Sequence, residues 1–353
     1  MPPAPIPSVA FCDHHVGGRD GNKAFPTLSR FEKDFVHVLY DADADCCPQA
    51  AQKWAAGEAR TLVLPYCLAD RAEKKTLHIT YDPYSSSLLE PNPAYGGFYA
   101  SIGTYDALIR ETSRVMERRP VDSTTIDALV SNGTAPAPDF LSIDVQGCTY
   151  EVLLGAAEAL RTTTIGLLVE AEFHEYYKGE KLFGDISRLA TEKGFHFAHF
   201  ERISQHGPHL APLGFRGTGF DYHADALFLR SIESVLASGP DDDTRYLLLR
   251  KLAFASLVLN QTEYAVRCLE AARTLSPSAD LLHALASTAY DPFLQGFDRL
   301  LVASPQTFPP RLCRPLHLRA KPHPLYPPRR RAGKERRTAA PPAFSRRYRS
   351  QPR

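Results

Sequence analysis

The feature that most constrains this chain of 353 residues is an alternation of short apolar runs with helix-like segments between residues 8 and 230. The runs show no clean polar–apolar alternation, which is typical of strands covered on both faces in a parallel sheet. Strands that alternate with helices predict an α/β fold. The runs that we interpret as strands are residues 9–16 (VAFCDHHV), 35–43 (FVHVLYDAD), 61–68 (TLVLPYCL), 140–145 (FLSIDV) and 165–173 (IGLLVEAEF).

Between and after these strands, helical patterns predict helices within residues 22–34, 46–57, 104–117, 124–131, 149–161 and 183–194. Two more strands follow, FHFAHFERI (195–203) and DYHADALFLR (221–230). The segment between them has no helical pattern, so we expect the two strands to pair antiparallel as a long hairpin. The sequence therefore predicts a mostly parallel sheet that ends in an antiparallel hairpin.

The sequence predicts three regions in all. Residues 8–232 form the α/β domain, and residues 240–300 form a helical appendage that begins with two helices within 240–276. Residues 305–353 are rich in proline and arginine and are predicted to be disordered, because they cannot bury enough apolar surface. The helical pair is expected either to pack on the main domain or to offer a face to a protein partner.

The charge is divided unevenly along the chain. Residues 305–353 hold 14 of the 41 basic and one of the 40 acidic residues, which leaves the rest with a net charge of −12. An acidic body repels phosphate backbones, so we expect no nucleic acid on the main domain. No segment of the sequence has the roughly 18 consecutive apolar residues that a membrane-spanning helix needs. The seven cysteines are scattered, a spacing that favours neither a disulfide framework nor a zinc site. The sequence also shows no signal-peptide pattern, so we expect a cytoplasmic location.

Ligands of open α/β sheets bind beyond the carboxyl ends of the strands, so the residues at those ends carry most of the functional information. Three glycines, Gly17, Gly18 and Gly21, follow the first strand. Glycine lets the backbone turn tightly and approach a ligand closely. A plain turn is the alternative interpretation of the three.

Acidic residues follow each of the next four strands. Asp41, with Asp43 as its alternate, follows the second strand and is suited to accept hydrogen bonds from the hydroxyls of a ribose. Asp70 follows the third and is suited to bind the amine of adenine. The remaining strand ends carry Asp144 and Gln146, and then Glu170 and Glu172.

A row of carboxylates at one edge of the sheet predicts a positively charged, adenosine-bearing ligand such as S-adenosylmethionine (SAM). The alternative is structural, because Asp and Glu also cap helices and favour their first turns. The sequence predicts no metal site.

The segment FLSIDVQGCTYEVLLGAAEAL (140–160) resembles the central motif of the FkbM-type SAM-dependent methyltransferases, in which Asp-x-Gln-Gly ends a strand. VEAEFHEYYKGEKLFGDI, STTIDAL, SSSLLEPN and DALFLR are similar to further segments of that family. The resemblance spans roughly residues 10–230. It implies a Rossmann-like class I methyltransferase domain, SAM as donor, and methyl transfer to a hydroxyl of a glycan or of another small molecule.

The resemblance also implies roles for single residues. Asp144 and Gln146 would line the junction of the cofactor and acceptor pockets, and Gly147 would permit the turn into the next helix. Thr149 stands where the family commonly has Glu, and we expect it to cap that helix instead.

A hydroxyl acceptor benefits from a general base, for which Asp144, Glu172 and His174 are the candidates. Two other functions stay open at this point. One is a non-catalytic adaptor built on a decayed methyltransferase domain, and the other is a nicotinamide-dependent oxidoreductase on a similar sheet. The antiparallel hairpin disfavours the second of these.

Overall fold

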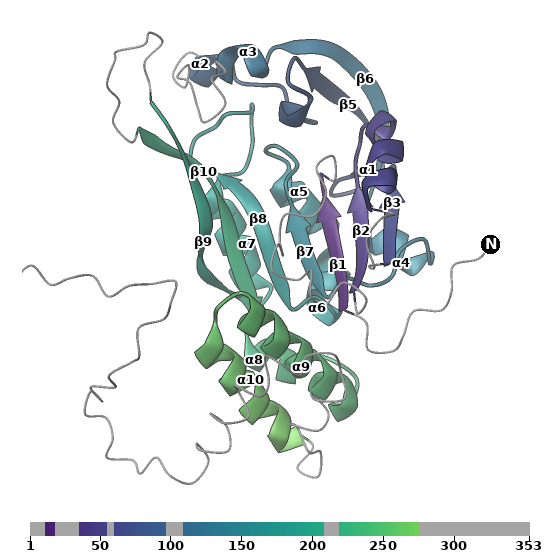
Figure 1. Cartoon of the computed structure of the whole chain (residues 1–353), viewed down its shortest axis with the longest axis vertical. Helices are drawn as coiled ribbons and strands as arrows, with labels where there is room; N and C mark the ends of the chain where they lie inside the picture. Colours follow the sequence, from purple (N-terminus) through teal and green to yellow (C-terminus); the bar gives the residue numbers. More distant parts are fainter. Residues whose placement is uncertain (1–10, 18–34, 55–59, 97–108, 208–218, 276–353) are drawn as a thin grey trace, which may run out of the picture. The chain divides into compact units, whose positions relative to one another are not determined.

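The computed structural model describes residues 11–17, 35–54, 60–96, 109–207 and 219–275. A seven-stranded sheet with the order β3-β2-β1-β7-β8-β10-β9 forms the centre of this part of the chain (Figure 1). Its strands are β1 (Phe11–Val16), β2 (Phe35–Tyr40), β3 (Arg60–Leu64), β7 (Phe140–Ile143), β8 (Gly166–Glu172), β9 (Phe195–His206) and β10 (Phe220–Arg230).

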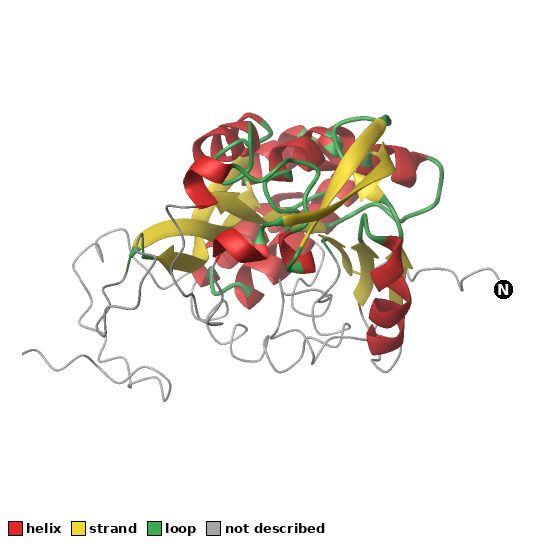
Figure 2. Ribbon diagram, turned by 90° about the horizontal axis from the view of Figure 1, so that it is seen from above, coloured by secondary structure: helices red, strands yellow, loops and turns green. Residues whose placement is uncertain are grey.

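The sheet has the predicted mixture of strand directions. Five strands run parallel to one another, namely β3, β2, β1, β7 and β8. The last two strands form an antiparallel hairpin, and β10 also runs antiparallel to β8. Seen from above, helices lie on either side of the strands (Figure 2). The predicted Rossmann-like α/β fold with its closing hairpin is confirmed.

One core joins the sheet to four helices, namely α4 (Ile126–Ser131), α5 (Thr149–Leu154), α6 (Ala157–Thr162) and α7 (Phe183–Glu192). Buried residues of β1, β2, β7 and β8 supply the other side of this core, which explains why these strands read as largely apolar runs. The prediction of one helix over 149–161 was only partly correct. Two helices, α5 and α6, form instead, and Gly155 lies between them. A Cβ at Gly155 would collide with the carbonyl oxygen of Ala69, so this position requires glycine.

A second, three-stranded sheet was not predicted. It has the order β4-β6-β5 and consists of β4 (Cys67–Leu68), β5 (Lys74–Thr80) and β6 (Val115–Thr124). The prediction of one strand over 61–68 was wrong, because the chain leaves the large sheet after Leu64 and reaches Pro65, which has no amide hydrogen for a ladder. The helix predicted over 104–117 was also wrong at its end, since residues 115–117 belong to β6.

Short helical elements connect these strands and contribute to the loops above the large sheet. They are η3 (Ala44–Cys46), α1 (Cys47–Trp54), η4 (Pro83–Ser85), α2 (Pro93–Gly96) and α3 (Ile109–Thr112). Among the described residues, no helix combines the length and the apolar content that crossing a membrane requires.

A second core lies at the amino-terminal ends of the parallel strands. There Phe11, Phe35 and Phe140 pack with α8 (Ile232–Ala237), α9 (Asp242–Val258) and α10 (Thr262–Leu275). Lys251 of α9 also donates to both oxygens of the buried Asp139, at 2.7 Å each. The helical pair therefore packs on the main domain. Residues 276–300 of the predicted appendage and the predicted tail over 305–353 lie outside the described residues.

The N-cap of α4 provides a simple test of this fold. Thr125 Oγ1 accepts a hydrogen bond of 3.0 Å from the amide of Ala128 and so satisfies one of the free donors at the helix start. We expect Thr125→Ala to lower the free energy of unfolding by about 1 kcal/mol, measured by urea denaturation. Thr191→Ala at an exposed position of α7 serves as control, and a loss of the same size there would contradict the capping role.

Candidate active site

A pocket of about 950 Å³ lies at the carboxyl ends of β1, β2, β7 and β8. Residues 82–88 of the second sheet's loops and the β9–β10 hairpin line its other sides. Its volume is at the upper end of the range of about 300–1,000 Å³ in which small molecules and cofactors bind. The site therefore sits where ligands of open α/β sheets are expected.

Gly17 brings the first strand end into this pocket. Its φ of +93° lies in the left-handed region, and its amide donates 2.9 Å to the carbonyl of Tyr40 at the end of β2. A Cβ on Gly17 would collide with the backbone oxygen of Asp144 at the end of β7. Only glycine lets three strand ends approach this closely. The predicted partners Gly18 and Gly21 lie outside the described residues.

Asp41 and Asp43 both line the pocket beyond β2, but they have different surroundings. Asp43 Oδ1 lies 3.0 Å from Nη1 of Arg119 and also accepts from the amide of Asp45, so it caps η3. Asp41 Oδ1 accepts a 2.8 Å hydrogen bond from the amide of Asp43, which fixes its orientation at the rim of the pocket. Because the Asp43 carboxylate is already bound by Arg119, Asp41 is the better candidate to contact a ligand.

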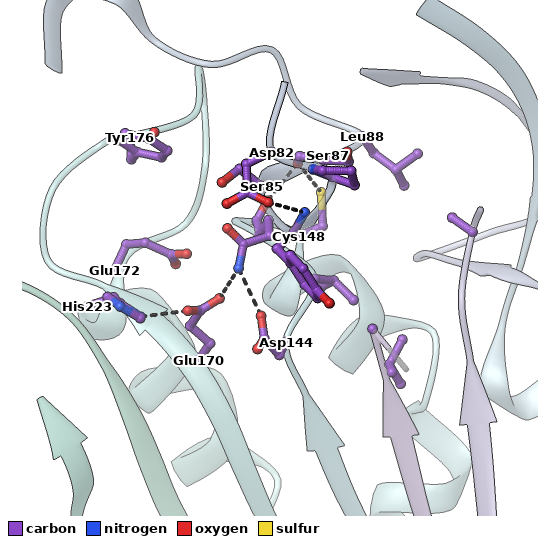
Figure 3. A pocket seen from close by; sticks show the side chains of 18 of the residues that line it. Asp82, Ser85, Ser87, Leu88, Asp144, Cys148, Glu170, Glu172, Tyr176 and His223 are labelled. Atoms are coloured by element: carbon purple, nitrogen blue, oxygen red, sulfur yellow. Dashed lines mark hydrogen bonds and ion pairs between the residues drawn. The ribbon is translucent and has the colours of Figure 1, made fainter. Parts of the chain in front are cut away.

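Gln146 links the ends of β7 and β8. Its Nε2 donates to Asp144 Oδ1 at 2.9 Å and to Glu170 Oε2 at 2.8 Å, and its Oε1 accepts from the Tyr177 hydroxyl at 3.0 Å. Both carboxylates lie close together beneath the pocket, as Figure 3 shows. The side-chain amide therefore fixes the orientation of Asp144 and Glu170.

The backbone at this turn is unusual. Gln146 has a φ of +54° and Gly147 a φ of +86°, so two successive residues are left-handed. The Ser87 hydroxyl donates 2.6 Å to the carbonyl of Gln146, which helps to hold this conformation. Non-glycine residues rarely adopt a positive φ, and such residues cluster at functional sites. The turn places the Gln146 side chain between the two strands.

The end of β8 contributes two buried carboxyl groups, Glu170 and Glu172, and both line the pocket. His223 of β10 lies with Nδ1 2.6 Å from Glu170 Oε1 (Figure 3). Thr149 was expected to cap α5, and this was wrong. It is buried and donates instead to the carbonyl of Glu170 at 2.9 Å, while Cys148 occupies the N-cap position without a side-chain hydrogen bond.

Burial dominates the titration of these groups. It raises the pKa of Glu170 to about 7, and the charge of Asp144 adds to this rise. Burial also raises the pKa of Glu172 well above its usual range, with Glu170 and Glu180 adding to the effect. For His223, burial lowers the pKa, but the attraction of Glu170 outweighs it and the net pKa is raised. Perturbed groups of this kind are typical of functional sites.

Glu180 allows this electrostatic picture to be tested through stability. Burial raises its pKa from 4.5 to about 8, while its Oε1 accepts from the Tyr177 amide at 3.0 Å. Because the folded-state pKa is the higher one, the associated stability is complete below about pH 4.5 and is lost as the pH rises toward 8.

We expect Glu180→Gln to match the wild type near pH 4.5 and to exceed it in unfolding free energy by about 4 kcal/mol at pH 8, as a pKa shift from 4.5 to about 8 implies. Urea denaturation at both pH values measures this. The exposed Glu192→Gln is the control and should follow the wild type throughout. An equal gain at both pH values would argue against a buried, protonated Glu180.

Two predicted site residues lie away from the pocket. Asp70 follows the short β4 of the second sheet and is not among the residues that line the pocket. Its carboxylate lies 3.5 Å from Arg71 and 3.6 Å from Lys75. The lining of the pocket therefore does not support its predicted contact with adenine. His174 also does not line the pocket, and its ring stands 6.1 Å from that of Tyr95. The other described candidates do line it: Gly17, Asp41, Asp43, Asp144, Gln146 and Glu172.

His223 and Tyr177 were not predicted as site residues. His223 was visible as a polar residue within an apolar strand, and its contact with Glu170 follows once β10 pairs with β8. Tyr177 comes from a loop, for which the sequence offered no positional signal. Among the described residues, no three His, Cys, Asp or Glu side chains converge as they would around a metal ion.

Residues 16–197 match the family model of the methyltransferase FkbM domain. The chain therefore belongs to the FkbM methyltransferase family, as its motifs indicated. Among solved structures it is similar to the methyltransferase FkbM from Methylobacillus flagellatus KT, with 12% sequence identity and a TM-score of 0.35. The similarity covers 62% of this chain and 43% of that one, so the chain matches less than half of that protein's length. A comparison with curated proteins finds no match.

Proposed function

We propose that this chain is a SAM-dependent methyltransferase that transfers a methyl group to a hydroxyl of a glycan or of another small molecule. Membership of the FkbM family supports methyl transfer. The choice of SAM as donor rests on the lining of the pocket. Four acidic residues line it along one edge of the sheet, namely Asp41, Asp144, Glu170 and Glu172. Such an excess of carboxyl groups suits a ligand with a positive charge and a ribose.

The residues present fit this cofactor. Asp41 is held at the rim beyond β2, where a carboxylate can accept hydrogen bonds from both ribose hydroxyls. Gly17 lines the pocket at the end of β1 and lets the ends of β1 and β7 approach each other closely. Glu172 keeps one buried oxygen without a hydrogen bond from the described residues, which matches a cationic ligand. When bound, SAM supplies an activated methyl group.

Asp144 is our choice for the general base. It lines the pocket between the cofactor edge and β8, and Gln146 orients its carboxylate through a 2.9 Å hydrogen bond. A base must be ionised to accept the proton of the acceptor hydroxyl. Glu172 is the weaker candidate because burial raises its pKa well above the usual range and so favours its protonated form. We expect the positioning of donor and acceptor in the pocket to be the main source of rate.

The ribose contact predicts a difference between two neighbouring acids. We expect Asp41→Asn to weaken the binding of S-adenosylhomocysteine (SAH) about tenfold, since a charge-assisted hydrogen bond contributes about 1.5–3 kcal/mol. Asp43→Asn, whose side chain is occupied by Arg119, is the matched comparison and should change affinity less than threefold. Isothermal titration measures both, and equal losses would contradict the assignment.

The catalytic proposal is tested by methyl transfer from radiolabelled SAM into a cell extract. Label in a small-molecule or glycan fraction supports it and identifies the acceptor class. A chain that binds SAM but labels nothing would favour the adaptor function instead. Stabilisation by a nicotinamide cofactor and not by SAM, in a thermal-shift screen, would favour the oxidoreductase.

A cytoplasmic location is part of the same proposal. Four cysteines that the structure describes are free thiols, which is the usual state in a reducing compartment: Cys12, Cys67, Cys148 and Cys268.

A further inference from the structure

One oxygen of Glu172 is unaccounted for in the pocket. The residue ends β8, is only 3% exposed and lines the pocket. Its carboxyl group points toward the centre of the site in Figure 3. Oε2 has no hydrogen-bond partner among the described residues. A buried polar atom without a partner costs free energy, so its position calls for a ligand.

The groups around Glu172 are mostly acidic. Glu170, Glu180 and Asp144 each raise the pKa of Glu172 further when they are ionised. Glu170 stands beside it on β8, Asp144 ends the neighbouring β7, and Glu180 lies in the loop after β8. An isolated buried carboxylate in such company is unfavourable unless a cation joins it.

Among the described residues, the basic side chains that line the pocket are either paired with another acid or neutral. His223, which pairs with Glu172 across the β8–β10 ladder, has Nδ1 2.6 Å from Glu170. Arg202 is 59% exposed at the rim and lies 3.3 Å from Asp225. Burial lowers the pKa of His206 to about 4, so this ring is neutral. Burial also raises the pKa values of three nearby tyrosines, which stay neutral as well: Tyr176, Tyr177 and Tyr222.

We propose that Glu172, supported by Glu170, forms a subsite for a positively charged centre of the ligand, and that this subsite distinguishes SAM from SAH. The inference rests on the proposed function and adds to it a means of selecting the charged donor over the neutral product. The two ligands share their nucleoside and amino-acid parts and differ in the sulfonium methyl group. Charge near the reacting sulfur is therefore what a carboxylate at this place can detect.

This assignment has a measurable consequence for protons. Burial and the neighbouring acids raise the pKa of Glu172 well above its usual range, which favours the protonated form before a ligand binds. A cation beside the carboxyl favours the ionised form and lowers that pKa. Binding of a cationic ligand must then release a proton, whereas a neutral ligand of the same shape leaves it in place. The proton goes to the buffer, where calorimetry detects it.

The cation has two possible sources, the sulfonium of the donor and an ammonium group on the acceptor. The first is favoured because a carboxylate at the end of β8 adjoins Asp144, which we place between donor and acceptor. An ammonium group on the acceptor is tested by titrating two compounds into the SAH complex. One is choline, which carries the charge, and the other is dimethylbutanol, its uncharged carbon isostere. Choline keeps its charge at every pH, so it contributes no proton of its own.

The test is calorimetric titration of the full chain with SAM and with SAH at pH 7, in two buffers that differ in ionisation enthalpy. For the wild type we expect SAM to release about one proton more than SAH and to bind about tenfold more tightly. Glu172→Gln should abolish the difference in proton release and reduce the affinity ratio to less than threefold. Glu175→Gln, in the exposed part of the same loop, is the matched control and should behave as the wild type.

The outcomes separate the inference from the proposed function. Equal proton release and equal affinity for SAM and SAH in the wild type, with no proton release on adding choline, overturn the subsite but leave the methyltransferase proposal standing. Proton release only when choline, and not dimethylbutanol, joins the SAH complex assigns the subsite to the acceptor. Failure of both SAM and SAH to bind removes the proposed function as well. Thermal melts of both variants verify that each is folded.

Discussion

Replacing Asp144 with asparagine is expected to lower turnover about 100-fold while the protein stays folded, because a general base contributes about 10²–10⁴-fold to rate. Asparagine has nearly the same shape and can still meet Gln146, but it cannot accept the proton of a hydroxyl. SAH formation with the acceptor fraction of the extract measures the rate. The affinity for SAH should change much less than the rate.

Asp221→Asn is the matched control, since this exposed acid of β10 stands near the site without lining the pocket. Its rate should stay within twofold of the wild type. Unchanged turnover in Asp144→Asn would remove Asp144 from the chemistry. A parallel loss of turnover and of melting temperature would show that the residue supports the fold and would leave its role as a base without support.

Gly17→Ala should lower the free energy of unfolding by about 3 kcal/mol, combining the cost of a left-handed alanine with displacement of a strand end. The added Cβ collides with the backbone oxygen of Asp144, and backbone cannot swing aside as a flexible side chain can. The same change should abolish SAH binding, because it separates the ends of β1 and β7. Urea denaturation and calorimetry measure the two effects.

Gly179→Ala provides an internal reference for this prediction. Gly179 also has a positive φ, +77°, but nothing lies within 4 Å of the Cβ that alanine would add. Gly179→Ala should therefore lower the free energy of unfolding by only about 1 kcal/mol, the cost of a left-handed alanine, and should leave the affinity for SAH unchanged. Equal destabilisation of the two variants would show that close packing at Gly17 has no special importance.

The sequence was sufficient to predict the large sheet because its central strands are buried on both faces and therefore read as apolar runs. The second sheet escaped prediction for the opposite reason. In β6 most residues are exposed or half-buried, and its sequence VMERRPVDST carries four charged residues and a proline. Its pairing with β5 and β4 depends on tertiary contacts that no local periodicity reveals.

The site was predictable to the extent that strand ends determine it. Asp41 and Asp144 reached one pocket because parallel strands present their carboxyl ends at the same edge. Asp70 did not, since the chain changes sheets after Leu64 and the acid follows a strand of the other sheet. The contact of Tyr177 with Gln146 joins two separate loops, which sequence patterns do not place.

The claim on which the account depends is that the pocket at the ends of β1, β2 and β7 holds an adenosine-bearing cofactor. A crystal structure of the full chain grown with SAH tests this most directly. We predict the ribose hydroxyls within hydrogen-bond distance of Asp41 and the amino-acid end of SAH beside Gly17 and Asp144. Density for SAH elsewhere on the chain, or an empty pocket at saturating SAH, would contradict the account.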